Sequence, residues 1–132
     1  MRYLLDANIL SDLIRHPRGA VAKTLTQKDA EEICTSIIVA AEMWFGAVKC
    51  GSATLPPKIA ALFSEIAVLP FEPPSEHTYA EIRADLERRG MPISGNDMLI
   101  AAHALALGCT LVTDNEREFS RIKGLKVENW LR

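Results

Sequence analysis

The sequence lacks the features that define several common protein classes. It has only three cysteines in 132 residues, an odd number without a CxxC spacing. This usage favours buried thiols, such as Cys34 and Cys109, in a reducing compartment. No apolar run approaches the length of a membrane span, and no basic segment followed by an apolar one opens the chain. We therefore expect a cytoplasmic protein without a membrane anchor.

Common catalytic signatures are also absent. The sequence contains no HExxH, no GxSxG and no glycine-rich loop that would cradle a phosphate. The formal net charge of −2 argues against a protein that holds nucleic acid by bulk charge alone. A metal ion or a local basic face can still supply the positive field that nucleic acid needs. Two clusters qualify as such a face: Arg83, Arg88 and Arg89, and the basic residues between 117 and 126.

What the sequence does contain is an alternation of short apolar segments and amphipathic ones. Hydrophobic residues make up 48% of the chain, enough for the core of one domain over residues 1–132. Strands that alternate with helices indicate an α/β fold with a parallel sheet covered on both faces. The predicted strands are 2–5, 33–35, 67–69, 110–112 and 126–128. The predicted helices are 8–15, 20–26, 36–50, 56–66, 75–89 and 94–107.

Acidic residues lie where several of these apolar segments begin or end. Asp6 follows the first strand, Glu42 lies inside an apolar helix, and Asp97 opens a second apolar helix. Asp114 and Asn115 follow the strand at 110–112. Because the carboxyl ends of parallel strands face one crevice, we expect these groups to converge there. Several carboxylates in one cleft indicate a hard divalent cation.

Each acidic residue also has a purely structural interpretation. Asp6 could cap the helix that follows it, and Ser94 with Asp97 has the form of a capping box. Asp114 and Asn115 are ordinary turn residues. Glu42 has no cation three or four positions away, so a surface ion pair does not explain it. His103, on the buried helix, is more simply a core histidine than a ligand.

Four segments together resemble the PIN-domain nucleases, specifically toxins of the VapC/FitB type. They are residues 5–11 (LDANILS), 35–43 (TSIIVAAEM), 97–104 (DMLIAAHA) and 111–115 (LVTDN), followed by Phe119. The C-terminal residues 127–130 (VENW) are also similar to the end of such toxins. The match spans the whole chain in the family's order. It implies a three-layer α/β/α PIN-like domain around a parallel sheet of four to five strands.

The resemblance also implies a set of site residues. Asp6, Glu42 and Asp97 match the family's acidic triad, which holds Mg²⁺, with Mn²⁺ able to substitute. The fourth position carries Asn115, which brings no charge. We therefore predict one metal ion in the free protein, held mainly by Asp6 and Asp97, with Glu42 acting through water. We also expect Asn115→Asp to raise metal affinity. The auxiliary candidates are Asp114, Glu118, Asn8 and Thr113.

The resemblance implies partners as well as an activity. It predicts a metal-dependent endoribonuclease, the toxin of a type II toxin–antitoxin module, that hydrolyses RNA phosphodiester bonds, for example in a tRNA loop. Its partners would be the RNA, a cognate VapB-type antitoxin and a second copy of the chain in a homodimer. Apolar residues around Met43–Phe45 and Ile59–Ile66 are candidates for an exposed groove that receives the antitoxin.

Two other functions stay open at this point. One is a PIN-like RNA-binding module with weakened or no catalysis, for which Asn115 is the main argument. The other is a metal-dependent phosphatase that acts on small phosphoesters. The chain has no Asp-x-Asp nucleophile motif, because residues 6–8 read Asp-Ala-Asn. Metal-dependent cleavage of RNA, but not of a small phosphoester, would separate the three functions.

Overall fold

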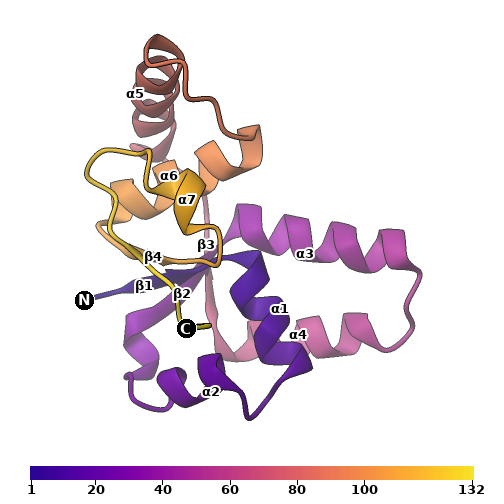
Figure 1. The fold of residues 1–132 in the computed structure, drawn as a ribbon. Coiled ribbons are helices and arrows are strands. Elements are labelled where there is room, and N and C mark those ends of the chain that lie inside the picture. The colour runs from indigo at the N-terminus through magenta and orange to yellow at the C-terminus, as the bar shows by residue number, and fades with distance from the viewer.

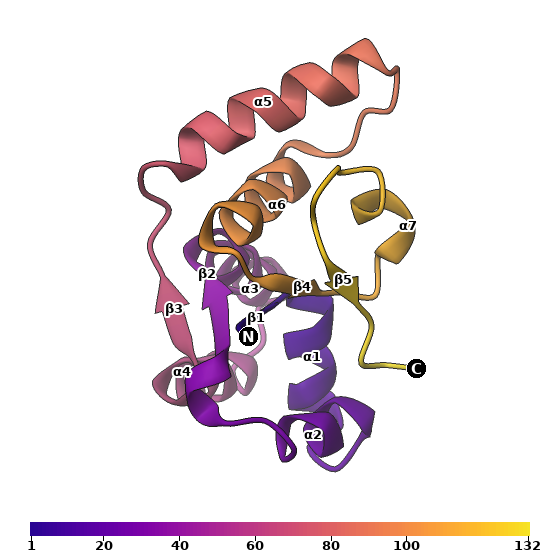
Figure 2. The same cartoon turned by 90° about the vertical axis from the view of Figure 1, so that its left-hand side faces the viewer.

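The computed structural model describes all of residues 1–132, and at its centre is a five-stranded parallel sheet (Figures 1 and 2). The strand order across the sheet is β3-β2-β1-β4-β5. The strands are β1 (Tyr3–Leu5), β2 (Ile33–Ser36), β3 (Ala67–Leu69), β4 (Thr110–Val112) and β5 (Val127–Glu128). The helices are α1 (Ala7–Arg15), α2 (Ala20–Leu25), α3 (Ile37–Cys50), α4 (Leu55–Glu65), α5 (Ser75–Arg88), α6 (Gly95–Leu107) and α7 (Glu116–Phe119).

The first strand lies at the centre of the sheet and sets the register of its neighbours. Leu4 of β1 pairs with Cys34 of β2 on one side and with Leu111 of β4 on the other. All three residues are fully buried, as a strand covered on both faces requires. Every pair of neighbouring strands is parallel, so the carboxyl ends of all the strands lie at one edge of the sheet. The residues that follow β1 and β4 are therefore neighbours.

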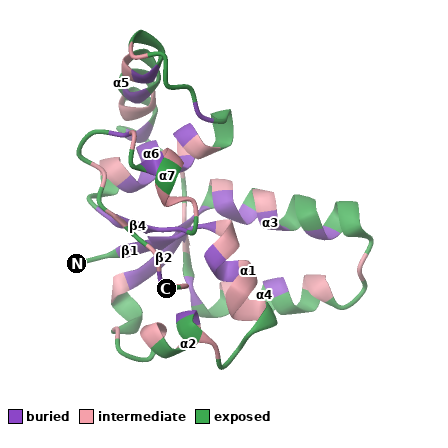
Figure 3. Cartoon of the chain, viewed as in Figure 1, coloured by how far each residue is buried: buried purple, intermediate pink, exposed green.

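Helices cover both faces of the sheet, which confirms the predicted three-layer arrangement. Figures 1 and 2 show α1, α2 and α4 on one side and α5, α6 and α7 on the other. Helices α3 and α4 extend together beyond the sheet, and Figure 3 shows that their far ends are mostly exposed. No helix combines the length and the apolar character that a membrane span needs.

The predicted strands and long helices are confirmed, with shifts of a residue or two at their ends. Helix α1 begins at Ala7, one residue earlier than predicted, because Asp6 caps it. Two short elements were not predicted: helix α7 and a 3₁₀ turn over Ala30–Glu32. Each is too short to produce a helical hydrophobic period, so the sequence pattern could not reveal it.

A single aromatic residue anchors α7 to the core. Phe119, the last residue of the helix, is fully buried and belongs to the main hydrophobic cluster. A four-residue helix has little stability of its own, so tertiary packing must hold it in place. Phe119 therefore fixes the position of the other α7 side chains, including Glu118.

We expect Phe119→Ala to lower the free energy of unfolding by roughly 3–5 kcal/mol, because it removes a buried ring and leaves a cavity. Denaturant unfolding followed by circular dichroism measures the change. Arg117→Ala on the exposed side of the same helix is the control, and it should alter stability by no more than about 0.5 kcal/mol. Equal effects of the two substitutions would contradict the anchoring role of Phe119.

Candidate active site

Asp6 is the buried centre of the candidate site. It follows β1 directly, and its backbone N–H donates to the carbonyl of Val112 at 2.9 Å. Its side chain is 5% exposed and accepts two hydrogen bonds, from the Ala7 backbone N–H at 2.8 Å and from the Thr113 hydroxyl at 2.7 Å. Asp6 is therefore both the cap of α1 and a carboxylate at the carboxyl edge of the sheet.

Two more carboxylates from separate helices lie close enough to Asp6 to sense its charge. Glu42 lies in α3 and Asp97 in the first turn of α6. The charge of Asp6 contributes to raising the pKa of both. The structure therefore brings together the three acidic residues that the sequence pattern predicted would converge.

Of the two contacts that define a capping box, the structure shows the one made by the Ser94 side chain. The Ser94 hydroxyl oxygen accepts a hydrogen bond from the Asp97 backbone N–H at 3.2 Å, and it caps α6. The Asp97 carboxylate also interacts with the Ser94 side chain. Asp97 therefore lies in the capped first turn of α6 and also near Asp6 and Glu118. A structural role at the helix start is compatible with a role in the acidic cluster.

Burial acts on all three carboxyl groups, and the charge of Asp6 acts on Glu42 and Asp97. Burial raises the pKa of Asp6 most strongly, against the two hydrogen bonds that favour its ionised form. Burial, followed by the charge of Asp6, raises the pKa of Glu42, and the same two causes, together with Glu118, raise the pKa of Asp97 to about 6. None of these carboxylates forms an ion pair with a lysine, arginine or histidine. The cluster therefore carries negative charge that the chain itself does not offset.

At the fourth acidic position Asn115 is accompanied by Glu118, one of the predicted auxiliary residues. The Asn115 amide nitrogen donates to Glu118 at 2.9 Å, and Glu118 lies close enough to Asp97 to raise the pKa of that carboxyl. Glu118 is thus the fourth carboxylate of the cluster, and Asn115 orients it. The sequence made Glu118 an auxiliary candidate because the family's fourth position falls on Asn115, whose missing charge Glu118 could supply.

The other auxiliary candidates hold the turn after β4. Thr113 donates its hydroxyl to Asp6 and accepts from the Asn115 backbone N–H at 3.0 Å. The Asn8 side chain donates to the Thr113 hydroxyl at 3.4 Å and accepts from the Asp114 backbone N–H at 3.1 Å. The carboxylate of Asp114 is exposed and accepts a hydrogen bond from the Asn129 side chain at 3.0 Å. Asp114 therefore points to Asn129, whereas Glu118 contacts the cluster.

Sequence reasoning missed Asn96. Its side chain lies close enough to Glu42 to lower the pKa of that carboxyl, which favours the ionised carboxylate. Asn96 lies inside the run that was interpreted only as a helix cap, and its partner is 54 positions away in the chain. Polar partners so distant in sequence leave no local pattern.

The carboxylates match the chemistry of a hard divalent cation without forming a rigid cage. Oxygen ligands with unpaired negative charge are what Mg²⁺ and Mn²⁺ prefer. No three His, Cys, Asp or Glu side chains are placed to ligate one ion together. This spacing suits Mg²⁺, which retains several waters and is held through one or two carboxylates.

A cavity of about 300 Å³ adjoins the acidic cluster between α1, α3 and α4. Glu42, Met43 and Ile59 contribute to its lining, so part of the predicted groove exists.

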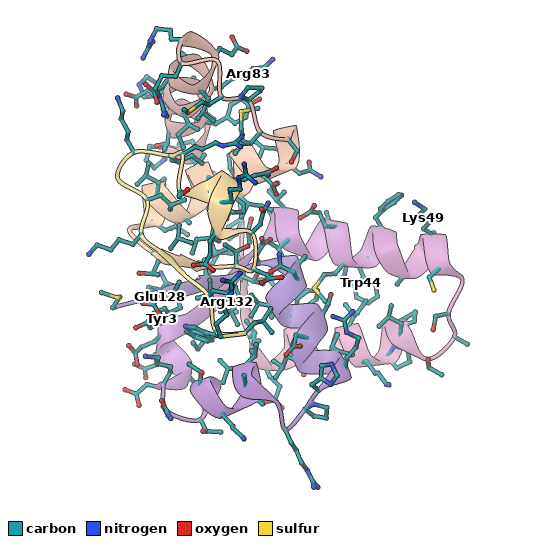
Figure 4. The ribbon with its side chains drawn as sticks, viewed as in Figure 1. Tyr3, Trp44, Lys49, Arg83, Glu128 and Arg132 are labelled. Carbon is teal, nitrogen blue, oxygen red and sulfur yellow. The ribbon has the colours of Figure 1, made fainter.

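Trp44 lies between α3 and α4 in Figure 4 and packs edge-on against Phe63 at 6.4 Å between ring centroids. Phe45 is 65% exposed and lines none of this cavity. Larger surface cavities beside α5 and after α1 contain none of the four carboxylates.

The predicted basic faces are largely engaged within the protein. Asp85 of α5 pairs with Arg88, Arg89 and Lys123, and Arg83 pairs with Glu87. Figure 4 places Arg83 on α5, at the end of the molecule farthest from α4. Most of these basic side chains therefore support α5 and the chain after α7.

Comparison with known proteins agrees with this geometry. The PIN domain family model matches residues 3–125. The chain is 33% identical to "Ribonuclease VapC2" of Haemophilus influenzae over 99% of both chains, and 31% identical to the "tRNA(fMet)-specific endonuclease VapC" of Shigella flexneri over 98% of both. The crystal structure of VapBC2 from Rickettsia felis bound to a promoter DNA fragment superposes with a TM-score of 0.90, at 36% identity, covering 98% of this chain and 99% of that one.

The chain therefore belongs to the PIN-domain family, in its VapC ribonuclease group. PIN-domain nucleases generally depend on a divalent metal. The unpaired carboxylates of this structure are consistent with that dependence.

We expect Asp97→Asn to stabilise the metal-free protein above pH 6. With a folded pKa near 6 against an ordinary value of 3.8, Asp97 retains a proton in the folded state that the unfolded chain releases. Stability therefore falls as the pH rises from about 4 to 6, and the penalty persists above that window. After discounting for solvent screening, the gain at pH 7 is about 1 kcal/mol.

Thermal unfolding in a chelating buffer between pH 4 and 8 measures this effect. Glu65→Gln, an exposed residue at the end of α4, is the control and should follow the unmodified protein. A lower melting temperature of Asp97→Asn at pH 7 would mean that the capping contacts of Asp97 outweigh the repulsion.

Proposed function

We propose that this chain is a cytoplasmic, metal-dependent endoribonuclease and the toxin of a type II toxin–antitoxin module, acting as one domain over residues 1–132. The observation that carries the proposal is the convergence of carboxylates from β1, α3, α6 and α7 around the buried Asp6, without a cation from the chain. The relatives named as ribonucleases support RNA cleavage as the reaction. The carboxylates are the residues that would bind the metal ion this reaction needs.

We assign the metal mainly to Asp6 and Asp97, with Glu42 acting through a water molecule and Glu118 in the fourth acidic role. Asp6 is fixed by its two hydrogen bonds, and Asp97 is held by the first turn of α6. Asn115 orients Glu118, and Asn96 orients Glu42. Oxygen ligands of this kind favour Mg²⁺, with Mn²⁺ as a substitute. When bound, such an ion polarises the phosphoryl oxygen and lowers the pKa of a water nucleophile.

The substrate we propose is a single-stranded RNA segment, such as a tRNA loop. Two arguments support this choice. A relative of similar length is named a tRNA(fMet)-specific endonuclease. Unpaired nucleotides can also be splayed so that one phosphate reaches a half-buried cluster, whereas a rigid duplex cannot adapt in this way.

The partner we propose is a VapB-type antitoxin, because the similar Rickettsia felis structure is a VapBC2 complex. The cavity beside Glu42 gives such a partner access to the acidic cluster. A homodimer of the chain is part of the same proposal.

We expect Asp97→Asn to reduce RNA cleavage by about 100-fold or more, because it removes a charged metal ligand. The measurement is cleavage of a tRNA pool in Mg²⁺, with a small chromogenic phosphoester as a second substrate. Glu76→Gln on the exposed start of α5 is the control and should retain full activity. Unchanged cleavage by Asp97→Asn would refute the proposed site, and hydrolysis of the phosphoester alone would favour a phosphatase.

The fourth acidic role can be assigned by two substitutions. We expect Glu118→Gln to weaken Mn²⁺ binding by about 10-fold, because it removes a carboxylate beside Asp97. Asn115→Asp should strengthen Mn²⁺ binding by adding charge, although it removes the hydrogen bond to Glu118. Titration calorimetry measures both, with Asp114→Asn as the control that leaves affinity unchanged. A loss of affinity with Asp114→Asn but not with Glu118→Gln would reverse the assignment.

A further inference from the structure

A buried hydrogen bond links the two helices that carry Glu42 and Asp97. His103 of α6 is 1% exposed, and its Nδ1 lies 2.7 Å from the hydroxyl oxygen of Ser36, which is fully buried. Ser36 is the residue before α3 and caps that helix by accepting from the Ile38 backbone N–H at 3.0 Å. The histidine of one helix is therefore bonded to the cap of the other.

The direction of this hydrogen bond follows from the surroundings of the ring. Because the Ser36 oxygen already accepts from Ile38, its own O–H is free to donate to Nδ1. Burial lowers the pKa of His103, which favours the neutral ring. The ring hydrogen then resides on Nε2. The Pro70 backbone and the charge of Glu72 oppose the lowering of the His103 pKa, and Phe71 packs edge-on against the ring at 5.3 Å between centroids. Ser36 is thus the side chain within hydrogen-bond distance of the imidazole, and it orients the ring through Nδ1.

A second polar contact joins the same two helices at the acidic site. The side chain of Asn96, in the first turn of α6, lies close enough to Glu42 of α3 to lower the pKa of that carboxyl. Glu42 lies six residues after Ser36, and Asn96 lies seven residues before His103. At 1.5 Å per residue these separations are about 9 and 10.5 Å, so α3 and α6 lie antiparallel with polar contacts at both ends of the shared stretch.

We propose that His103 is a positioning residue for the acidic site. Through Ser36 it fixes the offset of α3 along α6, and so sets the separation of Glu42 and Asp97 on either side of Asp6. The inference rests on the proposed function insofar as these carboxylates hold the metal. Removing the imidazole leaves Ser36 with an unpaired buried hydroxyl and leaves α3 free to slide by a fraction of a turn. Outer residues that orient ligands contribute to metal affinity in this way.

The test compares three substitutions of His103 that differ in where they place a polar atom. In His103→Asn the amide oxygen lies near the former Nδ1 and can accept from Ser36. In His103→Gln the amide lies near the former Nε2 instead, and His103→Phe keeps a ring without nitrogen. We expect the Gln and Phe variants to bind Mn²⁺ about 10-fold more weakly and to lose kcat on RNA with little change in KM. The Asn variant should retain most of both.

The control for simple destabilisation is Val21→Ala, a buried truncation in α2, a helix that carries none of the acidic residues of the site. It should lower the melting temperature without changing Mn²⁺ affinity. If His103→Phe and His103→Gln lower the melting temperature but leave Mn²⁺ affinity and kcat unchanged, the inference is overturned. Should His103→Phe fail to fold, the difference between the Asn and Gln variants decides, and equal Mn²⁺ affinities there would also overturn it.

Calorimetry keeps the two proposals separable. If the unmodified protein binds Mn²⁺ but leaves RNA intact, the proposed function fails, while the affinities of the His103 variants still decide the positioning role. If the unmodified protein cleaves RNA and the His103 variants bind Mn²⁺ normally, the function stands and the positioning role fails.

Discussion

The burial of one carboxylate at the end of the central strand is the constraint on which this site depends. Asp6 is almost inaccessible to solvent, and a buried charge is costly unless hydrogen bonds or a cation compensate it. The chain supplies two donors, the Ala7 backbone and the Thr113 hydroxyl, and no cation. These two hydrogen bonds begin α1 and tie the turn after β4 to β1. The same interactions that make burial tolerable therefore also shape the crevice.

The rest of the site is arranged around this residue by competition between repulsion and hydrogen bonding. Glu42 and Asp97 are each disfavoured by the charge of Asp6, yet each has an amide or hydroxyl partner that holds it in place. The polar residues Asn96, Ser94 and Asn115 thus retain an arrangement that the carboxylates alone would push apart. Preorganisation of this kind spares a metal site the cost of assembling its ligands when the ion binds.

The sequence predicted the convergence of the acidic triad because the underlying signals are local. Asp6 follows an apolar strand, and Asp97 follows a serine with capping spacing, so topology brings them to one edge. It did not predict the contact of Glu118, since α7 is four residues long and is held by Phe119. The pair of Ser36 and His103 was equally hidden, because 67 positions separate the partners. The expectation that His103 is a core histidine agrees with its burial, but the sequence did not indicate Ser36 as its partner.

The dual role of Asp6 has a consequence for inheritance. In a cell where the proposed activity is harmful, mutations that silence it are under positive selection. An allele altered at Asp6 loses a helix cap and the partner of Thr113 together with a carboxylate, so its product is exposed to proteolysis. An allele altered at Glu42 loses only its side-chain contacts, and its product stays folded. Inactivating substitutions that persist in a population should therefore be found more often at Glu42 and Asp97 than at Asp6. The inactive proteins would still bind their partner.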